Sequence, residues 1–179
     1  MQRFIVRLIF LGLLIFPISA YPASSVLQID TPVQVCFSPN EGCTDAIIRE
    51  IDHAKTEILV QAYSFTSAPI AKALVDAHKH GVMVQAVLDK SQRSEKYTSA
   101  TFLTNAGIPT YIDDKHAIAH NKIMIIDREI VITGSFNFTK AAEEKNAENV
   151  LIIRNRDLAK IYTDNWEKHK DHSEKYEGN

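Results

Sequence analysis

The feature that most constrains the fold is a change of rhythm halfway along the chain. In the first half, short apolar and β-branched runs alternate with amphipathic, helix-like runs. In the second half, two short strand-like runs are separated only by the dipeptide Asp127-Arg128, which predicts a hairpin. Alternating strands and helices followed by a hairpin predict an α/β fold, with a mixed β-sheet flanked by helices on both faces.

The individual elements follow from apolar spacing and from the residues at their ends. Ile70, Leu74 and Ala77 share one helical face, and Gly81 follows the end of that helix. The expected helices are 44 or 45–54, 68–80, 94–106, 139–145 and 157–170. The expected strands are 33–37, 57–64, 82–88, 109–112, 122–126, 129–133 and 149–153.

The N-terminal segment has the character of a secretory leader. Arg3 and Arg7 precede an almost wholly apolar run that is broken at Pro17. A basic start, a short apolar run and small residues after it are typical of a signal peptide, and the run is shorter than a membrane span. We therefore expect the folded part to lie outside the cytoplasm, in the periplasm or secreted. An uncleaved N-terminal membrane anchor is the alternative.

These limits predict a single folded domain. Cleavage after Ala20 or Ala23 removes a leader of up to 23 residues, 1–23. The remaining domain spans 24–170, a length that supports its own core. The polar segment 171–179 is expected to be a frayed tail.

Cys36 and Cys43 are the only two cysteines, and a turn-rich segment separates them. In an exported protein such a pair predicts a disulfide, which would contribute about 2.5 kcal/mol through chain entropy. Two buried free thiols are the weaker alternative. A metal site at this segment would need further ligands that the segment does not offer.

The charge balance counts against a protein that coats nucleic acid by global attraction. The chain has 20 basic and 22 acidic residues. Removal of 1–23 takes two basic residues and no acidic ones, so the remainder has 18 and 22 and a net charge of −4. A polyanionic substrate must therefore be attracted by a local patch.

Two closely spaced pairs of polar residues carry the predicted chemistry. His120 and Lys122 lie two residues apart at a strand, so they project to the same face about 6.5–7 Å apart. Asp127 has the opposite parity and is expected to anchor the turn. Ser135 and Asn137 form the second pair, directly after Gly134, which permits close backbone approach or an unusual dihedral angle.

These side chains suit phosphodiester cleavage without a metal. An imidazole supplies a nucleophile or proton carrier. Lys122, Ser135 and Asn137 would stabilise charge on the non-bridging oxygens in the transition state. Glu148, just before the last strand, would accept a hydrogen bond from the second nitrogen of His120 and select its tautomer.

The combined pattern resembles the H-x-K-x4-D-x6-G-S-x-N signature of the phospholipase D superfamily at every specified position. The stretches 62–66, 133–139 and 146–149 look like those of its small secreted bacterial endonucleases, and the resemblance covers most of 33–168. It implies the phospholipase D-like fold and a covalent phosphohistidine on His120. It also implies phosphate binding by Lys122, Ser135 and Asn137, support of His120 by Glu148, and a structural Asp127.

The resemblance also implies a homodimer. Most members of the superfamily carry the motif twice, because one histidine attacks while the other protonates the leaving oxygen. This chain has one copy. A symmetric interface between two copies would supply the missing acid. The function predicted is therefore a metal-independent endonuclease that hydrolyses DNA, or RNA, at a site shared across a homodimer and without a cofactor.

Three other functions are weaker alternatives. A phospholipase D acting on lipid phosphodiesters would use the same site, but would want an apolar rim or a membrane-binding segment. A degenerate member that only binds nucleic acid would not need the complete motif. A retained leader would make the protein a membrane-anchored nuclease in DNA uptake or processing.

Other polar and aromatic residues have simpler explanations. Asp113, Asp114, His116 and His120 could be drawn as a metal cluster, but the motif already uses His120, so no metal is expected. His78 and His80 suit the solvated end of a helix. Tyr63 and Phe65 could stack on bases, although alternating aromatics at a strand end more often belong to the core.

Overall fold

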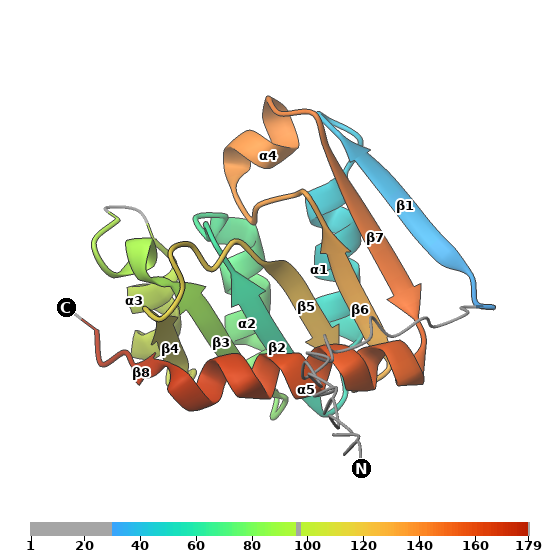
Figure 1. The fold of residues 1–179 in the computed structure, drawn as a ribbon. Coiled ribbons are helices and arrows are strands. Elements are labelled where there is room, and N and C mark those ends of the chain that lie inside the picture. The colour runs from blue at the N-terminus through green and yellow to red at the C-terminus, as the bar shows by residue number, and fades with distance from the viewer. Residues whose placement is uncertain (1–29, 96–97, 179) are drawn as a thin grey trace, which may run out of the picture.

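A single eight-stranded sheet forms the centre of the computed structural model, which describes residues 30–95 and 98–178 (Figure 1). The leader expected at 1–23 lies outside these described residues. The strands are β1 (Val33–Ser38), β2 (Glu57–Ala62), β3 (Met83–Asp89), β4 (Thr110–Asp113), β5 (Lys122–Ile126), β6 (Ile130–Gly134), β7 (Glu148–Arg154) and β8 (Glu174–Lys175). The helices are α1 (Cys43–His53), α2 (Ala68–Lys79), α3 (Ala100–Asn105), α4 (Lys140–Glu144) and α5 (Arg156–His172), with a 3-10 helix η1 (Lys90–Arg93).

The sheet is mixed, as the change of rhythm in the sequence predicts. Its strand order is β1-β7-β6-β5-β2-β3-β4-β8. The strands β2, β3 and β4 are parallel, because helices connect them, and the other pairings are antiparallel. The predicted hairpin joins β5 to β6 through Asp127 and Arg128, whose positive φ angles of 53° and 56° suit a two-residue turn.

Helices cover both faces of the sheet, and the alternation of side chains along β2 shows why. Ile58 and Val60 point to the main core, which lies under α1 and α2, while Leu59 packs on the other face with Trp166 of α5. Trp166 also donates its indole N–H to the carbonyl of Val60 at 2.8 Å. Figure 1 shows α5 crossing the face of the sheet opposite α1 and α2. The predicted fold class is therefore confirmed.

The helix expected at 94–106 is shorter in the structure. The chain turns through η1 at Lys90–Arg93, and α3 begins only at Ala100. The side chain of Gln92 explains the difference, since its Oε1 accepts hydrogen bonds from the Phe65 amide at 3.1 Å and from Thr98 Oγ1 at 3.0 Å. These bonds hold part of the connecting segment in a non-helical conformation.

The expectation of a frayed tail at 171–179 is wrong as far as Gly178. Helix α5 continues to His172, and β8 then pairs with β4 as the last strand of the sheet. Tyr176 is buried and its hydroxyl lies 2.9 Å from Thr101 Oγ1. The apolar burial of one aromatic ring outweighs the polar character of the rest of the segment.

The predicted disulfide is confirmed. Cys36 in β1 is bonded to Cys43 at the start of α1. The bridge ties the edge strand β1, which has few helical contacts of its own, to the core. Among the described residues, none of the helices is long and apolar enough to cross a membrane.

Candidate active site

The register of the sheet brings the two halves of the motif to one end. Lys122 pairs with Ala62 in the register of β5 with β2. In β6, Gly134 pairs with Val150 of β7. Met124 pairs with Ile132, so extending that register by two residues sets Lys122 opposite Gly134. His120, which precedes β5, and Ser135, which follows β6, therefore lie at the same end of these two neighbouring strands.

His120 and Lys122 both lie against the ring of Tyr63. The imidazole and phenol ring centroids are 4.7 Å apart, and Lys122 Nζ lies 5.1 Å from the Tyr63 centroid. Lys122 Nζ also donates to the backbone carbonyl of His120 at 2.9 Å. The imidazole is exposed whereas the lysine is buried. The histidine is thus open to a substrate, with a fixed ammonium group beside it.

Tyr63 is a site residue that the sequence analysis treated as part of the core. Phe65 is fully buried and follows that expectation, but Tyr63 is only half-buried because it stands where β2 ends. The backbone N–H of Tyr63 donates to the carbonyl of Asn121 at 2.8 Å, which holds it beside the His120 segment. The sequence signal for this role was the position of Tyr63-Ser64-Phe65 at the end of the strand. Two aromatic residues at the end of a strand need not be buried equally, so one of them could line a site.

The burial of Lys122 changes its acidity. Desolvation lowers the pKa of the ammonium group, and the negative charge of Glu148 opposes that effect. Glu148 therefore acts electrostatically on Lys122 although it lies at the start of β7. The negative charge of Glu148 raises the pKa of Lys122 and so favours the cationic form of the lysine before a phosphate is bound.

Gly134 is required by close packing against β7. Its φ is 148°, and a Cβ at this position would lie 2.2 Å from the carbonyl oxygen of Asn149. That carbonyl accepts hydrogen bonds from the amides of Ser135 at 3.1 Å and Phe136 at 3.3 Å. The glycine thus allows the chain to turn Ser135 towards β7, which agrees with both roles predicted for it.

Ser135 is held by three hydrogen bonds. Its hydroxyl donates to Glu148 Oε2 at 2.6 Å and accepts from the backbone and side-chain nitrogens of Asn149 at 3.1 and 3.3 Å. The side chain is exposed to solvent in spite of these bonds. The hydroxyl is therefore oriented in advance, and its hydrogen bond to Glu148 must be exchanged when a phosphate oxygen arrives.

Glu148 contacts Ser135 rather than His120, contrary to the predicted support of the histidine. Its other oxygen accepts a hydrogen bond from Asn146 Nδ2 at 3.2 Å, and no hydrogen bond joins Glu148 to His120 within 30–95 and 98–178. The reason is the strand order, because β6 lies between β5 and β7 and separates their backbones by about 10 Å. Ser135, which follows β6, is consequently closer to the Glu148 carboxylate and forms the hydrogen bond with it.

Asn137 lies two residues after Ser135, in the loop that follows β6. Its side chain is half-buried, and Oδ1 is a buried atom with no hydrogen-bond partner in the part of the chain that the structure describes. A buried acceptor without a partner carries a cost in free energy. The backbone carbonyl of Asn137 accepts from Thr139 N at 2.7 Å, which fixes the loop that carries it.

Asp127 lies at the opposite end of β5 from Lys122 and has a structural role. Its carboxylate accepts hydrogen bonds from the backbone amides of Lys55, Thr56 and Glu57 at 2.8, 2.7 and 3.0 Å, and from the Thr56 hydroxyl at 2.9 Å. Burial by itself would raise the pKa of this carboxyl, but the hydrogen bonds outweigh it and the pKa is lowered. The expectation that Asp127 anchors the turn, and does not join His120 and Lys122, therefore agrees with its position in the structure.

The metal cluster considered as an alternative is not formed in the way the sequence suggested. The structure joins Asp113 and His116 to His169 and His172 of α5, and it includes neither Asp114 nor His120 in that group. Burial would raise the pKa of Asp113, but the imidazoles of His169, His172 and His116 beside it outweigh burial and lower that pKa to about 2. This cluster is separate from the set around His120.

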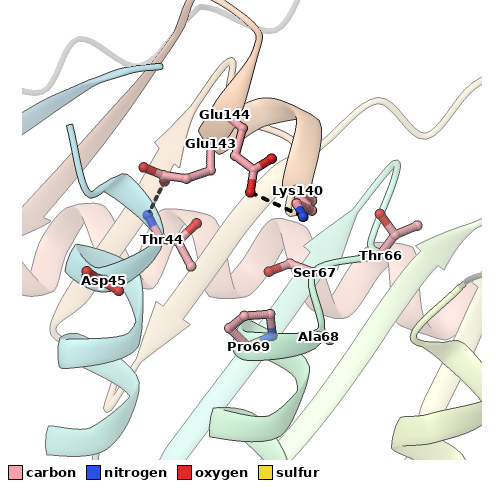
Figure 2. A pocket seen from close by; sticks show the side chains of 9 residues that line it. All are labelled: Thr44, Asp45, Thr66, Ser67, Ala68, Pro69, Lys140, Glu143 and Glu144. Carbon is pink, nitrogen blue, oxygen red and sulfur yellow. Dashed lines mark hydrogen bonds and ion pairs between the residues drawn. The ribbon is translucent and has the colours of Figure 1, made fainter. Parts of the chain in front are cut away.

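A pocket of about 490 Å³ lies between α4 and the starts of α1 and α2 (Figure 2). Glu143 accepts hydrogen bonds from the amides of Gly42 and Thr44 at 3.1 and 2.7 Å, so it occupies the N-terminal end of α1. The dipole of that helix is thereby already matched by a carboxylate. The pocket is lined by none of the residues of the predicted site.

Comparison with known proteins agrees with this geometry. Residues 47–170 match the family described as cardiolipin synthase, PLD-like domain. A phospholipase D of Rickettsia felis (strain ATCC VR-1525 / URRWXCal2) is 46% identical over 149 residues, which cover 83% of this chain and 74% of that protein. The crystal structure of Nuc, a phospholipase D family member from Salmonella typhimurium, has a TM-score of 0.79 and 40% identity, over 82% of this chain and 99% of that chain. NucT from Helicobacter pylori shares the fold with a TM-score of 0.77 at 23% identity, over 82% of this chain and 100% of that one.

The fold and the site together define a phosphodiesterase with one histidine-lysine motif per chain. The chain belongs to the phospholipase D superfamily, as the motif predicted, and it is a phosphodiester hydrolase of that superfamily.

Proposed function

We propose that this protein is an endonuclease that hydrolyses DNA, or RNA, without a metal ion in its reaction centre. The observation that carries the proposal is the exposed His120 imidazole next to a buried, fixed Lys122, with the Ser135 hydroxyl oriented just after the neighbouring strand β6. A nucleophile and charge-stabilising donors thus lie together at one end of the neighbouring strands β5 and β6. A phosphodiester needs both, because negative charge grows on its non-bridging oxygens during attack.

In the proposed reaction, a nitrogen of His120 attacks phosphorus and the bond from phosphorus to the leaving oxygen breaks. The product is a covalent phosphohistidine, and the leaving oxygen takes a proton from a general acid. Water then loses a proton to the same group, now acting as a base, and attacks phosphorus; the phosphorus–nitrogen bond breaks, which releases the phosphate product and regenerates free His120. Lys122, Ser135 and Asn137 hold the non-bridging oxygens in both steps.

The general acid is proposed to be the His120 of the partner subunit in a symmetric dimer. His116, the nearest alternative in the sequence, has Nδ1 between 3.0 and 3.1 Å from both Asp113 oxygens and stacks near His169. Its ring is therefore committed to another cluster. A two-fold axis that passes between two His120 side chains supplies attacker and acid from identical chains.

In this proposal Glu148 acts on the phosphate-binding groups instead of on the histidine. Its carboxylate holds the Ser135 hydroxyl at 2.6 Å and favours the charged form of Lys122. When phosphate displaces the carboxylate from Ser135, the hydroxyl is already directed and little conformational entropy is lost.

Nucleic acid is proposed as the substrate because the site is open and carries an aromatic ring. The half-buried Tyr63 lies beside His120 and offers a face on which a base or sugar can stack. The crystal structure that is 40% identical to this chain is that of Nuc. As expected for an exported enzyme, we propose that the leader directs the domain to the periplasm or outside the cell.

Phospholipase D activity is the second candidate. Ile118, two residues before His120 in the sequence, is 57% exposed and offers an apolar side chain to a lipid. The relative from Rickettsia felis that is 46% identical is named phospholipase D. One apolar side chain is a small surface for a lipid bilayer, which favours the nucleic-acid proposal.

The deciding experiment incubates purified protein with plasmid DNA, single-stranded DNA, RNA and phosphatidylcholine vesicles, each with excess EDTA. We expect DNA or RNA cleavage and no release of choline, with His120→Asn as the inactive control. A denaturing gel of the protein quenched during turnover should show a covalent adduct with labelled DNA. Choline release without nucleic-acid cleavage would establish the lipid function, and activity restored only by a divalent ion would refute the metal-free reaction.

A further inference from the structure

Four side chains from distant parts of the sequence face one another at the end of β4. Asp113 is the last residue of β4, His116 follows in the next loop, and His169 and His172 lie one turn apart at the end of α5. Each offers one ligand atom, and the four atoms lie within 4.8 Å of one another. Figure 1 shows this end of α5 next to β4 and β8.

The distances in this cluster suit a small tetrahedral ion. Asp113 Oδ2 lies 3.0 Å from His116 Nδ1, 2.7 Å from His169 Nδ1 and 3.3 Å from His172 Nε2. In a tetrahedral zinc site with bonds of 2.0–2.1 Å, neighbouring ligand atoms are about 3.3 Å apart. The three distances to Asp113 are already near that value, and because all four atoms lie within 4.8 Å of one another, side-chain rotations that close the widest spacing by up to about 1.5 Å would bring them around one ion.

Hydrogen bonding alone does not satisfy this cluster. Three imidazole nitrogens converge on Asp113 Oδ2, while Oδ1 accepts from the Lys115 amide at 3.1 Å and also lies 3.1 Å from His116 Nδ1. His172 Nε2 is the atom left over, since it is buried and makes no hydrogen bond in the described residues although it lies near Asp113. A metal ion bonded to each ligand separately removes this shortage. The Asp113 side chain is itself fully buried, so its charge needs a partner.

We propose that Asp113, His116, His169 and His172 form a structural zinc site. Three imidazoles and one carboxylate are a ligand set that zinc accepts, and with four protein ligands the coordination sphere is closed. The site goes beyond the proposed hydrolysis, because none of its ligands belongs to the group around His120. No metal was expected from the sequence because the motif already uses His120, and no local pattern links His169 and His172 to His116, more than fifty residues away.

The location indicates what the ion would stabilise. His116 lies on the segment that leads from β4 to His120, and Lys90 Nζ and Asp89 Oδ2 hold the same segment through the His116 carbonyl at 3.0 Å and the Ala119 amide at 2.7 Å. The two histidines of α5 lie just before β8. Zinc would therefore clamp the nucleophile's loop and the last strand to the end of α5.

Direct metal binding to the full, untagged protein tests the proposal. Protein stripped with EDTA is dialysed against ZnCl2, and bound zinc is counted by elemental analysis. We expect one zinc per chain and a rise in Tm of about 5–10 °C at a hundredfold excess over Kd. Replacement with Co2+ should give the strong visible absorption of a tetrahedral site.

Variants locate the ion. His172→Ala and His169→Ala should each lower zinc affinity at least tenfold, whereas His80→Ala should not, although His80 also lies at the end of a helix. Equal zinc binding by His172→Ala, or no stoichiometric zinc in the wild type, would refute the site. Nuclease activity is not the readout: loss of zinc in EDTA should lower Tm while cleavage persists at low temperature, so each proposal can fail independently.

Discussion

Replacement of Asp127 tests whether this motif residue supports the fold or the reaction. Its carboxylate accepts three backbone N–H bonds, two from the turn before β2 and one from Glu57, the first residue of β2, and its φ of 53° lies in the left-handed region. Asp127→Ala loses those bonds to a charged acceptor and places a Cβ-bearing residue without local hydrogen bonds at positive φ. Because Lys55 and Thr56 are exposed, water can replace part of the loss.

The expected cost of Asp127→Ala is therefore about 1.5 kcal/mol from hydrogen bonds and about 1 kcal/mol from backbone strain. A total of about 2–3 kcal/mol corresponds to a fall in Tm of roughly 5–10 °C for a domain of this size. Asp127→Asn keeps one acceptor oxygen and tolerates positive φ, so it should cost about half as much. Urea unfolding at pH 7 measures both values.

The pH dependence gives a second readout for the same residue. The pKa of Asp127 is lowered by folding, so its contribution to stability is present above the pKa of the unfolded carboxyl, about 3.9, and disappears as the pH falls through the lower folded value. The stability difference between wild type and Asp127→Asn should accordingly shrink in acid. If Asp127→Ala kept full stability but lost turnover at a temperature where it is folded, the structural assignment would be wrong.

Four further outcomes are expected. Mixing wild type with excess His120→Asn under exchanging conditions should reduce activity towards the fraction of wild-type dimers; a fully active monomer in sedimentation would exclude the shared site. Ser135→Ala should lower kcat by about 10²–10³-fold through loss of one charge-stabilising donor, without a change in Tm; an unchanged kcat would remove its role. Gly134→Ala should lower both stability and activity, because its Cβ would lie 2.2 Å from the Asn149 carbonyl oxygen, and a variant with normal Tm would contradict that packing. Thiol titration of unfolded, unreduced protein should find no free thiol; two would mean that Cys36 is unpaired in solution.

Sequence periodicity was sufficient for the layers of this protein. The alternation along β2, where Ile58 and Val60 face one core and Leu59 the other, is a property of the extended backbone and can be predicted without coordinates. The same parity separates Asp127 from His120 and Lys122. The disulfide was predictable because Cys36 and Cys43 have no other partner in the chain.

The tertiary structure decided which side chains meet across strands. Glu148 was expected at His120, but the position of β6 between β5 and β7 gives it to Ser135, and no local pattern contains that strand order. Tyr63 became a site residue because β2 ends beside the segment before β5. In the same way, Asp113 and His116 meet His169 and His172 only because α5 crosses the sheet from β7 to β4. Local sequence determines the conformation of each element and the face of each side chain, whereas contacts between distant elements depend on how the whole chain packs its core.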